Sequence, residues 1–185
     1  MTKYLLALLA ALALAASPAR ALETQEDADG TLNAQELTLE YFARKADASV
    51  FDPLLCFHGY IFDKMGDHKI ANRIFERCAA EGVMAALPWL AWEEENGYVN
   101  GSNPEKAAEW DRKAAEAGYS IGQFNYGLDL LRGRGVSRDV IRGRALIDRA
   151  ATQGDTAAQE LARQGYDPES VTPEADKQRY RKPMF

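Results

Sequence analysis

Residues 97–154 read GYVNGSNPEKAAEWDRKAAEAGYSIGQFNYGLDLLRGRGVSRDVIRGRALIDRAATQG, and this stretch decides the fold. In it and just before it, small residues recur at an interval of 36 positions: Gly82, Gly118 and Gly154; Gly97 and Gly133; and the pairs Ala114-Ala115 and Ala150-Ala151. Self-similarity at a period of about 20 to 50 residues is typical of stacked supersecondary units. The sequence therefore predicts a helical repeat protein.

The spacing of apolar residues outlines three helix pairs around this register. They cover residues 54–78, 84–115 and 121–151, with turns at Gly66-Asp67, Asn96-Gly97 and 133–136. A lone helix after Asn33, ending near Ala46, and a single helix over 155–163 flank the pairs, as expected of atypical terminal units. Pro88 either lies in the first turn of its helix or bends that helix.

The third pair resembles a known family. Its residues follow the order Gly122, Tyr126-Gly127, Gly133-x-Gly135-Val136, Asp139, Gly143, Leu146 and Ala150-Ala151-x-x-Gly154. This order is similar to the pattern of the Sel-one-like repeat (SLR) family, although Tyr126, Gly143 and Leu146 replace the usual Leu, Ala and Trp. The second pair fits less well, and the first pair fits least. Simple tetratricopeptide repeats are the alternative, but their period of about 34 residues and their lack of this glycine-rich loop count against them.

The resemblance implies an all-α fold, an α/α solenoid of stacked antiparallel helix pairs, with about three SLR units plus capping helices. SLR proteins are adaptors, often exported, that grip another protein with their concave surface. The resemblance therefore implies protein–protein interaction as the function. Three roles fit it: an assembly adaptor, a regulator that holds an envelope sensor, and an immunity protein that neutralises a toxin.

Partner-binding residues are expected on the first helix of each pair, because these helices line the inner wall of such a stack. Trp, Tyr and Arg are favoured there, since each offers a large contact area or a rigid set of donors. The candidates are His58, Tyr60, Trp89, Trp92, Glu93, Asn125, Asp129 and Arg132. A place in the core is the competing interpretation for Trp89 and Trp92, and a solvated face is the competing interpretation for Glu93 and its acidic neighbours.

The first residues of the chain indicate export. Lys3 precedes a Leu/Ala run over 5–16, and Ala19-Arg20-Ala21 offers a cleavage site, as in a secretory signal peptide. The apolar run is too short to favour a membrane anchor. The predicted segments are a signal peptide (1–21), a flexible acidic lead-in (22–32), an SLR solenoid domain (33–165) and a C-terminal tail with a candidate capping helix (166–185). We expect a periplasmic or secreted protein, without membrane insertion after signal cleavage.

The net charge of the chain indicates which kinds of molecule are unsuitable as binding partners. The 185 residues carry 28 acidic and 22 basic side chains, a net charge of −6. Removal of residues 1–21, with Lys3 and Arg20, makes the net charge about −8. Such a chain has no general attraction for nucleic acid or anionic lipid, so the expected partner is a protein. The tail has a basic end at Arg179, Arg181 and Lys182, which either covers the stack or engages a partner.

Cys56 and Cys78 lie symmetrically about Asp67, in the turn of the first pair. In an antiparallel helix hairpin, this places both at one height, about 16 Å from the turn. A disulfide is favoured in an exported chain, and the resemblance implies the same, because a cysteine-rich branch of the SLR family cross-links its helix pairs. Two buried free thiols are the alternative.

No cofactor is expected. A zinc site made of Cys56, His58, His68 and Cys78 has suitable ligand types but unsuitable spacing. His68 directly follows the turn and lies about 15 Å along the helix from Cys78. We therefore expect no metal at these four residues.

The sequence contains no motif for a catalytic nucleophile, a metalloprotease or a phosphate loop, and no catalytic residue is assigned. Acid–base chemistry would fall on His58 or on carboxylates such as Glu93 and Glu94. The alternative to an interaction protein is a periplasmic enzyme of the cysteine-rich SLR type acting on β-lactam or cell-wall compounds, which the resemblance implies.

Overall fold

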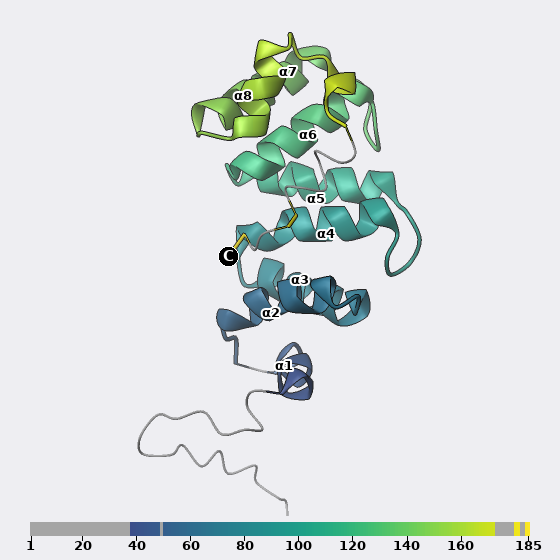
Figure 1. The fold of residues 1–185 in the computed structure, drawn as a ribbon, viewed down its shortest axis with the longest axis vertical. Coiled ribbons are helices and arrows are strands. Elements are labelled where there is room, and N and C mark those ends of the chain that lie inside the picture. Colours follow the sequence, from purple (N-terminus) through teal and green to yellow (C-terminus); the bar gives the residue numbers. More distant parts are fainter. Residues whose placement is uncertain (1–37, 49, 173–179, 182–183) are drawn as a thin grey trace, which may run out of the picture. The chain divides into compact units, whose positions relative to one another are not determined.

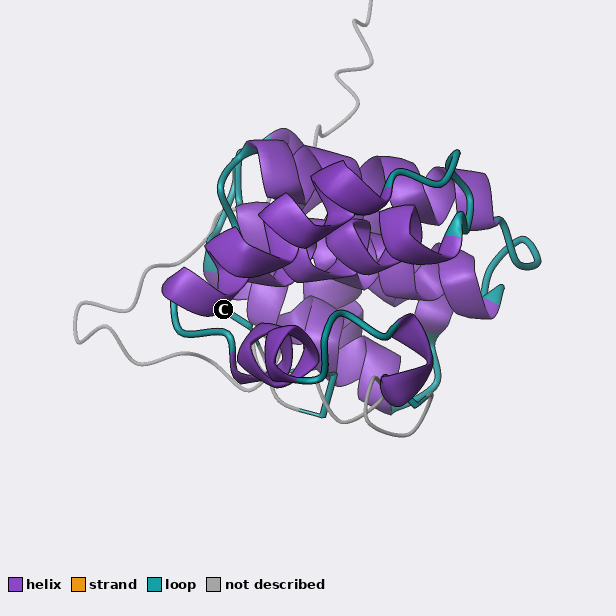
Figure 2. Cartoon of the chain, turned by 90° about the horizontal axis from the view of Figure 1, so that it is seen from above, coloured by secondary structure: helices purple, strands orange, loops and turns teal. Residues whose placement is uncertain are grey.

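The computed structural model describes residues 38–48, 50–172, 180–181 and 184–185, all within one compact unit, Ala34–Phe185. Regular structure in these ranges is helical, and no strand occurs in them (Figures 1 and 2). The α-helices are α1 Leu39–Lys45, α2 Leu54–Lys64, α3 His68–Ala80, α4 Leu87–Asn96, α5 Pro104–Glu116, α6 Ser120–Arg132, α7 Val140–Thr152 and α8 Thr156–Arg163. Two 3-10 turns, η2 Met84–Ala86 and η3 Pro168–Ser170, precede α4 and follow α8.

The α-helices pack in chain order. Three helix pairs form as predicted, α2 with α3, α4 with α5, and α6 with α7. At the two ends of this series, α1 packs on α2, and α8 packs on α7. Helix α4 also contacts α6, so the first helices of the second and third pairs lie side by side. The all-α architecture of stacked helix pairs is confirmed.

The repeated residues fix the helix ends. The side chains of Asp67, Asn103 and Asp139 accept hydrogen bonds from backbone N–H groups three residues later, at 3.2, 3.0 and 3.0 Å. These N-caps satisfy donors that the first helical turn leaves open. Gly97 and Gly133 end α4 and α6 with φ of +70° and +71°, which glycine adopts without steric cost. The connection from α4 to α5 and the connection from α6 to α7, 36 residues later, are therefore built in the same way.

Two further helix starts were uncertain from the sequence. Pro88 lies in the first turn of α4, where its missing N–H costs no helical hydrogen bond. Helix α1 begins later than predicted, at Leu39, with the Thr38 side chain accepting from a backbone N–H as its N-cap. Asn33, the predicted N-cap, lies outside the described residues. The end of α1 at Lys45 agrees with the prediction.

The core is formed by apolar faces of successive helices. Trp89, Phe75 and Leu90 are buried in a cluster that joins α2, α3 and α4. Trp89 stacks on Phe75, with their ring centroids 5.5 Å apart. Phe124 and Ile147 are buried in a second cluster that joins α6, α7 and α8. Each helix therefore depends on its neighbours to cover its apolar face.

The predicted disulfide is present. Cys56 in α2 and Cys78 in α3 are bonded, with their Cα atoms 5.9 Å apart, and both are buried. The alternative of two free thiols is wrong. Because both sulfur atoms are bonded to each other, the four-residue zinc site with His58 and His68 does not form. A disulfide fits an oxidising compartment.

Several predicted segments lie outside the described residues. They are the signal peptide (1–21), the acidic lead-in (22–32) and most of the candidate helix between Thr172 and Tyr180. The limits of the solenoid domain at 33–165 remain predictions. Of the helices in the described ranges, none has the length and apolar character needed to cross a membrane.

We predict that removing the disulfide destabilises the whole stack. The loop that it closes spans 22 residues, and the loop-closure model gives about 3 kcal/mol for such a loop. Urea unfolding of the double variant Cys56→Ala/Cys78→Ala should show this loss relative to the oxidised protein. Dithiothreitol should weaken the wild type and leave the double variant unchanged. Equal stability of the two proteins would contradict the prediction.

Candidate functional site

All eight predicted partner-binding residues lie on the first helices of the pairs. His58 and Tyr60 belong to α2. The α4 residues are Trp89, Trp92 and Glu93, and the α6 residues are Asn125, Asp129 and Arg132. Their burial differs: Trp89 and Glu93 are buried, and the other six are half-buried.

Four of these residues line one pocket. Trp92 of α4 meets Asn125, Asp129 and Arg132 of α6 around a narrow pocket of about 40 Å³. Tyr180, from the C-terminal tail, lines the same pocket. We call this site the α4–α6 pocket. It exists because α4 and α6 are in contact, which places their exposed faces on one surface.

Tyr180 is held in the α4–α6 pocket by aromatic packing and a hydrogen bond. It is 3% exposed. Its ring stacks on Trp92 with centroids 4.5 Å apart and meets the edge of Trp89 at 5.2 Å. Asn125 Nδ2 donates to the Tyr180 hydroxyl oxygen at 3.0 Å. Aromatic packing together with a partner for the hydroxyl is the arrangement in which a buried tyrosine is most stable.

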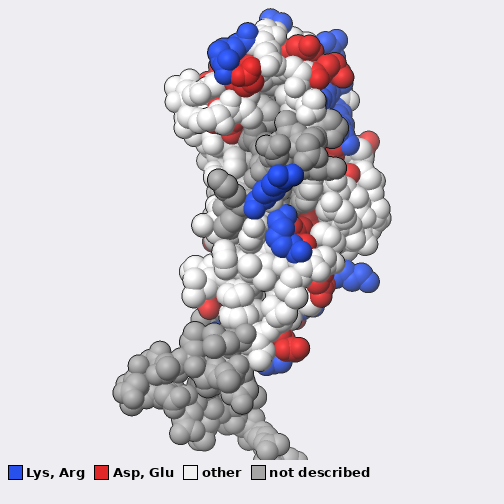
Figure 3. Space-filling view, in the orientation of Figure 1, with Lys and Arg blue, Asp and Glu red and all other residues white. Residues whose placement is uncertain are grey.

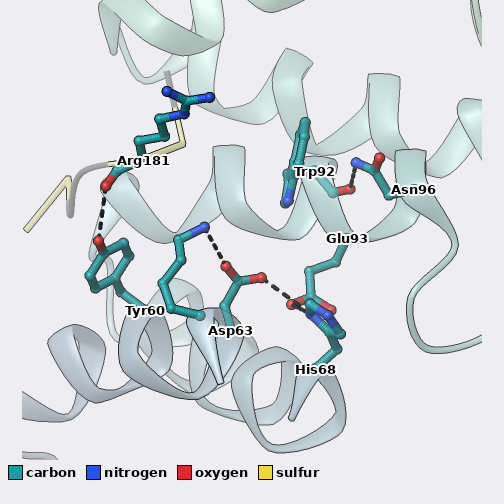
Figure 4. Close-up of polar contacts among 8 residues, drawn as sticks. Tyr60, Asp63, His68, Trp92, Glu93, Asn96 and Arg181 are labelled. Carbon is teal, nitrogen blue, oxygen red and sulfur yellow. Dashed lines mark hydrogen bonds and ion pairs between the residues drawn. The ribbon is translucent and has the colours of Figure 1, made fainter. Parts of the chain in front are cut away.

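Polar side chains also hold the backbone of the tail. Tyr60 donates its hydroxyl hydrogen to the Arg181 carbonyl at 2.9 Å, as Figure 4 shows. Arg132 Nη2 donates to the carbonyls of Pro168 and Val171, both at 2.8 Å. Every polypeptide segment has backbone carbonyls, whereas the space filled by the Tyr180 ring fits an aromatic side chain. The site thus combines general contacts to a main chain with one specific side-chain pocket.

The α4–α6 pocket carries charge of both signs. Glu95 pairs with Arg134, and Asp111 accepts a hydrogen bond from Asn125 at 2.9 Å. Three carboxylates, those of Glu95, Asp111 and Asp129, stand against two guanidinium groups in the lining. On the face drawn in Figure 3, acidic and basic side chains are interspersed among uncharged ones.

Two of the candidates, Trp89 and Glu93, are buried, and for Trp89 this agrees with the competing interpretation of a place in the core. Trp89 is completely buried because its ring packs between Phe75 and Tyr60, and it belongs to the core. Glu93 is 2% exposed and faces α2 and α3. His58 is half-buried away from the α4–α6 pocket; its ring stacks on Phe42, and its Nδ1 lies 2.8 Å from the Leu54 carbonyl oxygen.

Glu93 has an unusual electrostatic environment. Burial raises its pKa from 4.5 to about 8, and the nearby negative charges of Asp63 and Glu94 act in the same direction, while Lys64 opposes them. Glu94 is also buried and pairs with Lys106. From the sequence, Glu93 is a partner-binding candidate, with a solvated acidic face as the competing interpretation, and both glutamates are acid–base candidates. Their burial follows from tertiary packing, which the run of glutamates does not reveal.

Tyr180 is not among the site residues that the sequence predicts. The basic residues beside it suggested a capping or partner-binding tail, but no local pattern pairs this tyrosine with Trp92 and Asn125, which lie more than fifty positions away. An aromatic residue between basic residues in an otherwise polar tail was the only signal.

This chain is similar in structure to two solved proteins. The crystal structure of a Sel1 repeat protein from Oxalobacter formigenes matches 66% of this chain and 48% of its own, with 24% identity and a TM-score of 0.54. The crystal structure of a protective antigen from uropathogenic Escherichia coli strains, displaying an SLR fold, matches 83% of this chain and 33% of its own, with 27% identity and a TM-score of 0.61. No protein-family model and no curated protein matches the sequence.

Successive helix pairs that pack on one another define an α-helical repeat protein, and the α4–α6 pocket lies on the first helices of two of these pairs. More specifically, this chain has the SLR fold, as the order of its repeated residues predicts. It spans about half of the first of these two proteins and a third of the second.

We predict that Tyr180 stabilises the folded chain. Tyr180→Ala removes a buried ring from between Trp89 and Trp92 and should lower the free energy of unfolding by about 3 kcal/mol. Tyr180→Phe keeps the ring and loses only the hydrogen bond from Asn125, so it should cost about 1 kcal/mol. Urea unfolding monitored by tryptophan fluorescence measures both. If Tyr180→Ala were neutral, the tail would not be docked in solution.

Proposed function

We propose that this protein binds a partner protein by holding an extended segment of it in the α4–α6 pocket. The observation that carries the proposal is Tyr180, which the chain itself holds there, 3% exposed against Trp92 and Asn125. A pocket that holds one extended segment through a single aromatic anchor and carbonyl contacts is suited to holding another with the same chemistry. The tail then competes with the partner for this pocket.

The chemistry of the partner segment follows from that of the tail. Tyr180 lies between Arg179 and Arg181, with Lys182 next. The pocket lining carries three carboxylates and two guanidinium groups. We therefore expect a segment with an exposed aromatic residue flanked by basic ones. The identity of the partner decides between an assembly adaptor, a regulator of an envelope sensor and an immunity protein.

A synthetic peptide tests the pocket directly. The peptide covers residues 172–185 (TPEADKQRYRKPMF), carries a fluorophore and is titrated with the full-length Tyr180→Ala protein, whose pocket lacks its own tyrosine. We expect binding by fluorescence anisotropy, and weaker binding to the wild type, because a tethered tail competes at an effective concentration of about a millimolar. The matched control is the same peptide with alanine in place of tyrosine, which should bind at least about tenfold more weakly.

Changes in the pocket wall complete this test. Asn125→Ala and Trp92→Ala, each combined with Tyr180→Ala, should weaken peptide binding, because they remove the hydrogen bond and the stacking surface. Circular dichroism checks that each variant is folded, and Asn125→Ala serves if Trp92→Ala is not. If the peptide bound both variants with unchanged affinity, its contact would lie elsewhere and the proposed pocket would be refuted.

We also propose that the protein acts in the periplasm. The support is the Cys56–Cys78 disulfide, together with the predicted signal peptide over 1–21. Expression of the full chain in a Gram-negative host should release a shortened protein into the periplasmic fraction, and amino-terminal sequencing should begin at Leu22. A replacement of Leu8 and Leu9 by Arg interrupts the apolar run and should keep the protein in the cytoplasm. Retention of the uncut wild-type chain in the cytoplasm would contradict export.

A further inference from the structure

Three side chains from three helices converge beside the turn between α2 and α3. Asp63 lies near the end of α2, His68 is the first residue of α3, and Glu93 lies in α4. Figure 4 shows the three pointing toward one another. His68 Nδ1 lies 3.2 Å from Asp63 Oδ1 and 3.5 Å from Glu93 Oε1, and one ligand atom of each residue lies within 4.8 Å of the others. We call these three residues the Asp–His–Glu cluster.

Four buried polar atoms of the Asp–His–Glu cluster lack hydrogen-bond partners. These atoms are Asp63 Oδ1, His68 Nδ1 and both carboxylate oxygens of Glu93. The side chains of Asp63 and Glu93 are only 3% and 1% exposed, so water does not satisfy them from the surface. Buried polar atoms in folded proteins nearly always have a partner. One such atom from each residue lies within 4.8 Å of the others, which indicates a ligand between them.

The charge of the surroundings indicates the sign of that ligand. Lys64 pairs with the other oxygen of Asp63, Oδ2, at 2.8 Å, which leaves Oδ1 available. Glu94, next to Glu93, pairs with Lys106 on the far side. The cluster thus contains two buried carboxylates, and one ammonium group, that of Lys64, lies beside them. A cation would remove this imbalance.

The geometry suits a small, four-coordinate metal ion. Zinc lies about 2.0–2.1 Å from nitrogen and oxygen ligands, which places tetrahedral ligand atoms about 3.3 Å apart. The two measured distances from His68 Nδ1, 3.2 and 3.5 Å, agree with this value. An imidazole ligand favours a first-row transition metal over magnesium or calcium, which prefer oxygen alone. The His68 side chain is 23% exposed, so the cluster lies close to the surface of the protein.

We propose that Asp63, His68 and Glu93 form a binding site for a divalent transition-metal cation, with zinc as the best match. This site differs from the zinc site considered from the sequence, because its partners for His68 are carboxylates and not cysteines. The cation joins the first helix pair to α4 of the second pair. Tyr98, whose ring stacks on His68 with centroids 4.1 Å apart, holds the imidazole in position.

Calorimetry with Zn²⁺ alone tests the site. The full chain, oxidised, untagged and stripped with a chelator, should bind one Zn²⁺ per molecule, and Mg²⁺ should not compete. Glu93→Gln and Asp63→Asn preserve side-chain shape and should each weaken Zn²⁺ binding at least about tenfold. His58→Gln removes the only other histidine and should leave Zn²⁺ binding unchanged. At a hundred times its dissociation constant, Zn²⁺ should raise the wild-type Tm by about 5 °C and that of Glu93→Gln much less.

X-ray absorption at the zinc edge identifies the ligands. The proposal expects a shell of nitrogen and oxygen at about 2.0 Å and no sulfur. Three results would overturn it: no stoichiometric Zn²⁺ binding by the wild type, equal affinity in Glu93→Gln and Asp63→Asn, or loss of affinity in His58→Gln. The first would mean that the contacts among the three side chains and Lys64 suffice without a metal ion. Reductant is omitted, because free thiols would add zinc ligands of their own.

Discussion

Neighbouring helices in this chain approach so closely that a single methyl group does not fit between some of them. A Cβ atom added to Gly122, at the start of α6, would lie 2.2 Å from the Ala114 Cβ of α5. A Cβ atom added to Gly127 would lie 3.0 Å from the carbonyl oxygen of Gly143 in α7. Packed interiors do not absorb such overlaps without shifting whole elements. The small residues that repeat in the sequence are therefore the contacts that set the spacing of the stack.

Both sites depend on that spacing. The α4–α6 pocket forms because α5 and α6 pack closely enough for α4 to reach α6 across the pair boundary. The Asp–His–Glu cluster forms because α4 lies against the turn between α2 and α3. Each site takes residues from more than one helix pair, so an isolated unit would carry neither. The repeat architecture thus supplies surfaces that are absent from its single units.

The sequence predicts the local features well because they depend on residues close together in the chain. The predicted turns at Gly66-Asp67, Asn96-Gly97 and 133–136 follow from nearby residues. In the structure, Asp67, Asn103 and Asp139 cap the next helices through contacts three residues away. The disulfide was predictable because both cysteines belong to one hairpin. The SLR resemblance predicted how the helix pairs stack on one another. The two solved SLR structures, which match 66% and 83% of this chain, support that prediction.

Side-chain orientation across pair boundaries was not predictable in this way. Trp89, Trp92 and Glu93 lie within five residues on α4 and looked alike as inner-wall candidates. Trp89 enters the core, Trp92 faces the α4–α6 pocket, and Glu93 faces His68. Adjacent side chains on a helix point about 100° apart. Which of them meets the core, the pocket or His68 depends on where the other helices lie. The pairing of Asp63, His68 and Glu93 has the same origin.

The division of α4 between two sites has a mechanical consequence. Trp92 stacks on Tyr180 on one side of the helix, while the adjacent Glu93 faces Asp63 and His68 on the other. Lys64, which pairs with Asp63, also lies over the rings of Tyr60 and Trp89, and Tyr60 holds the Arg181 carbonyl. A cation at the proposed site would hold α4 against α2 and α3, and with them the Trp92–Tyr180 stacking and the Tyr60–Arg181 hydrogen bond. Since coupling between two binding sites is reciprocal, the proposed partner and the proposed cation would each change the affinity of the protein for the other.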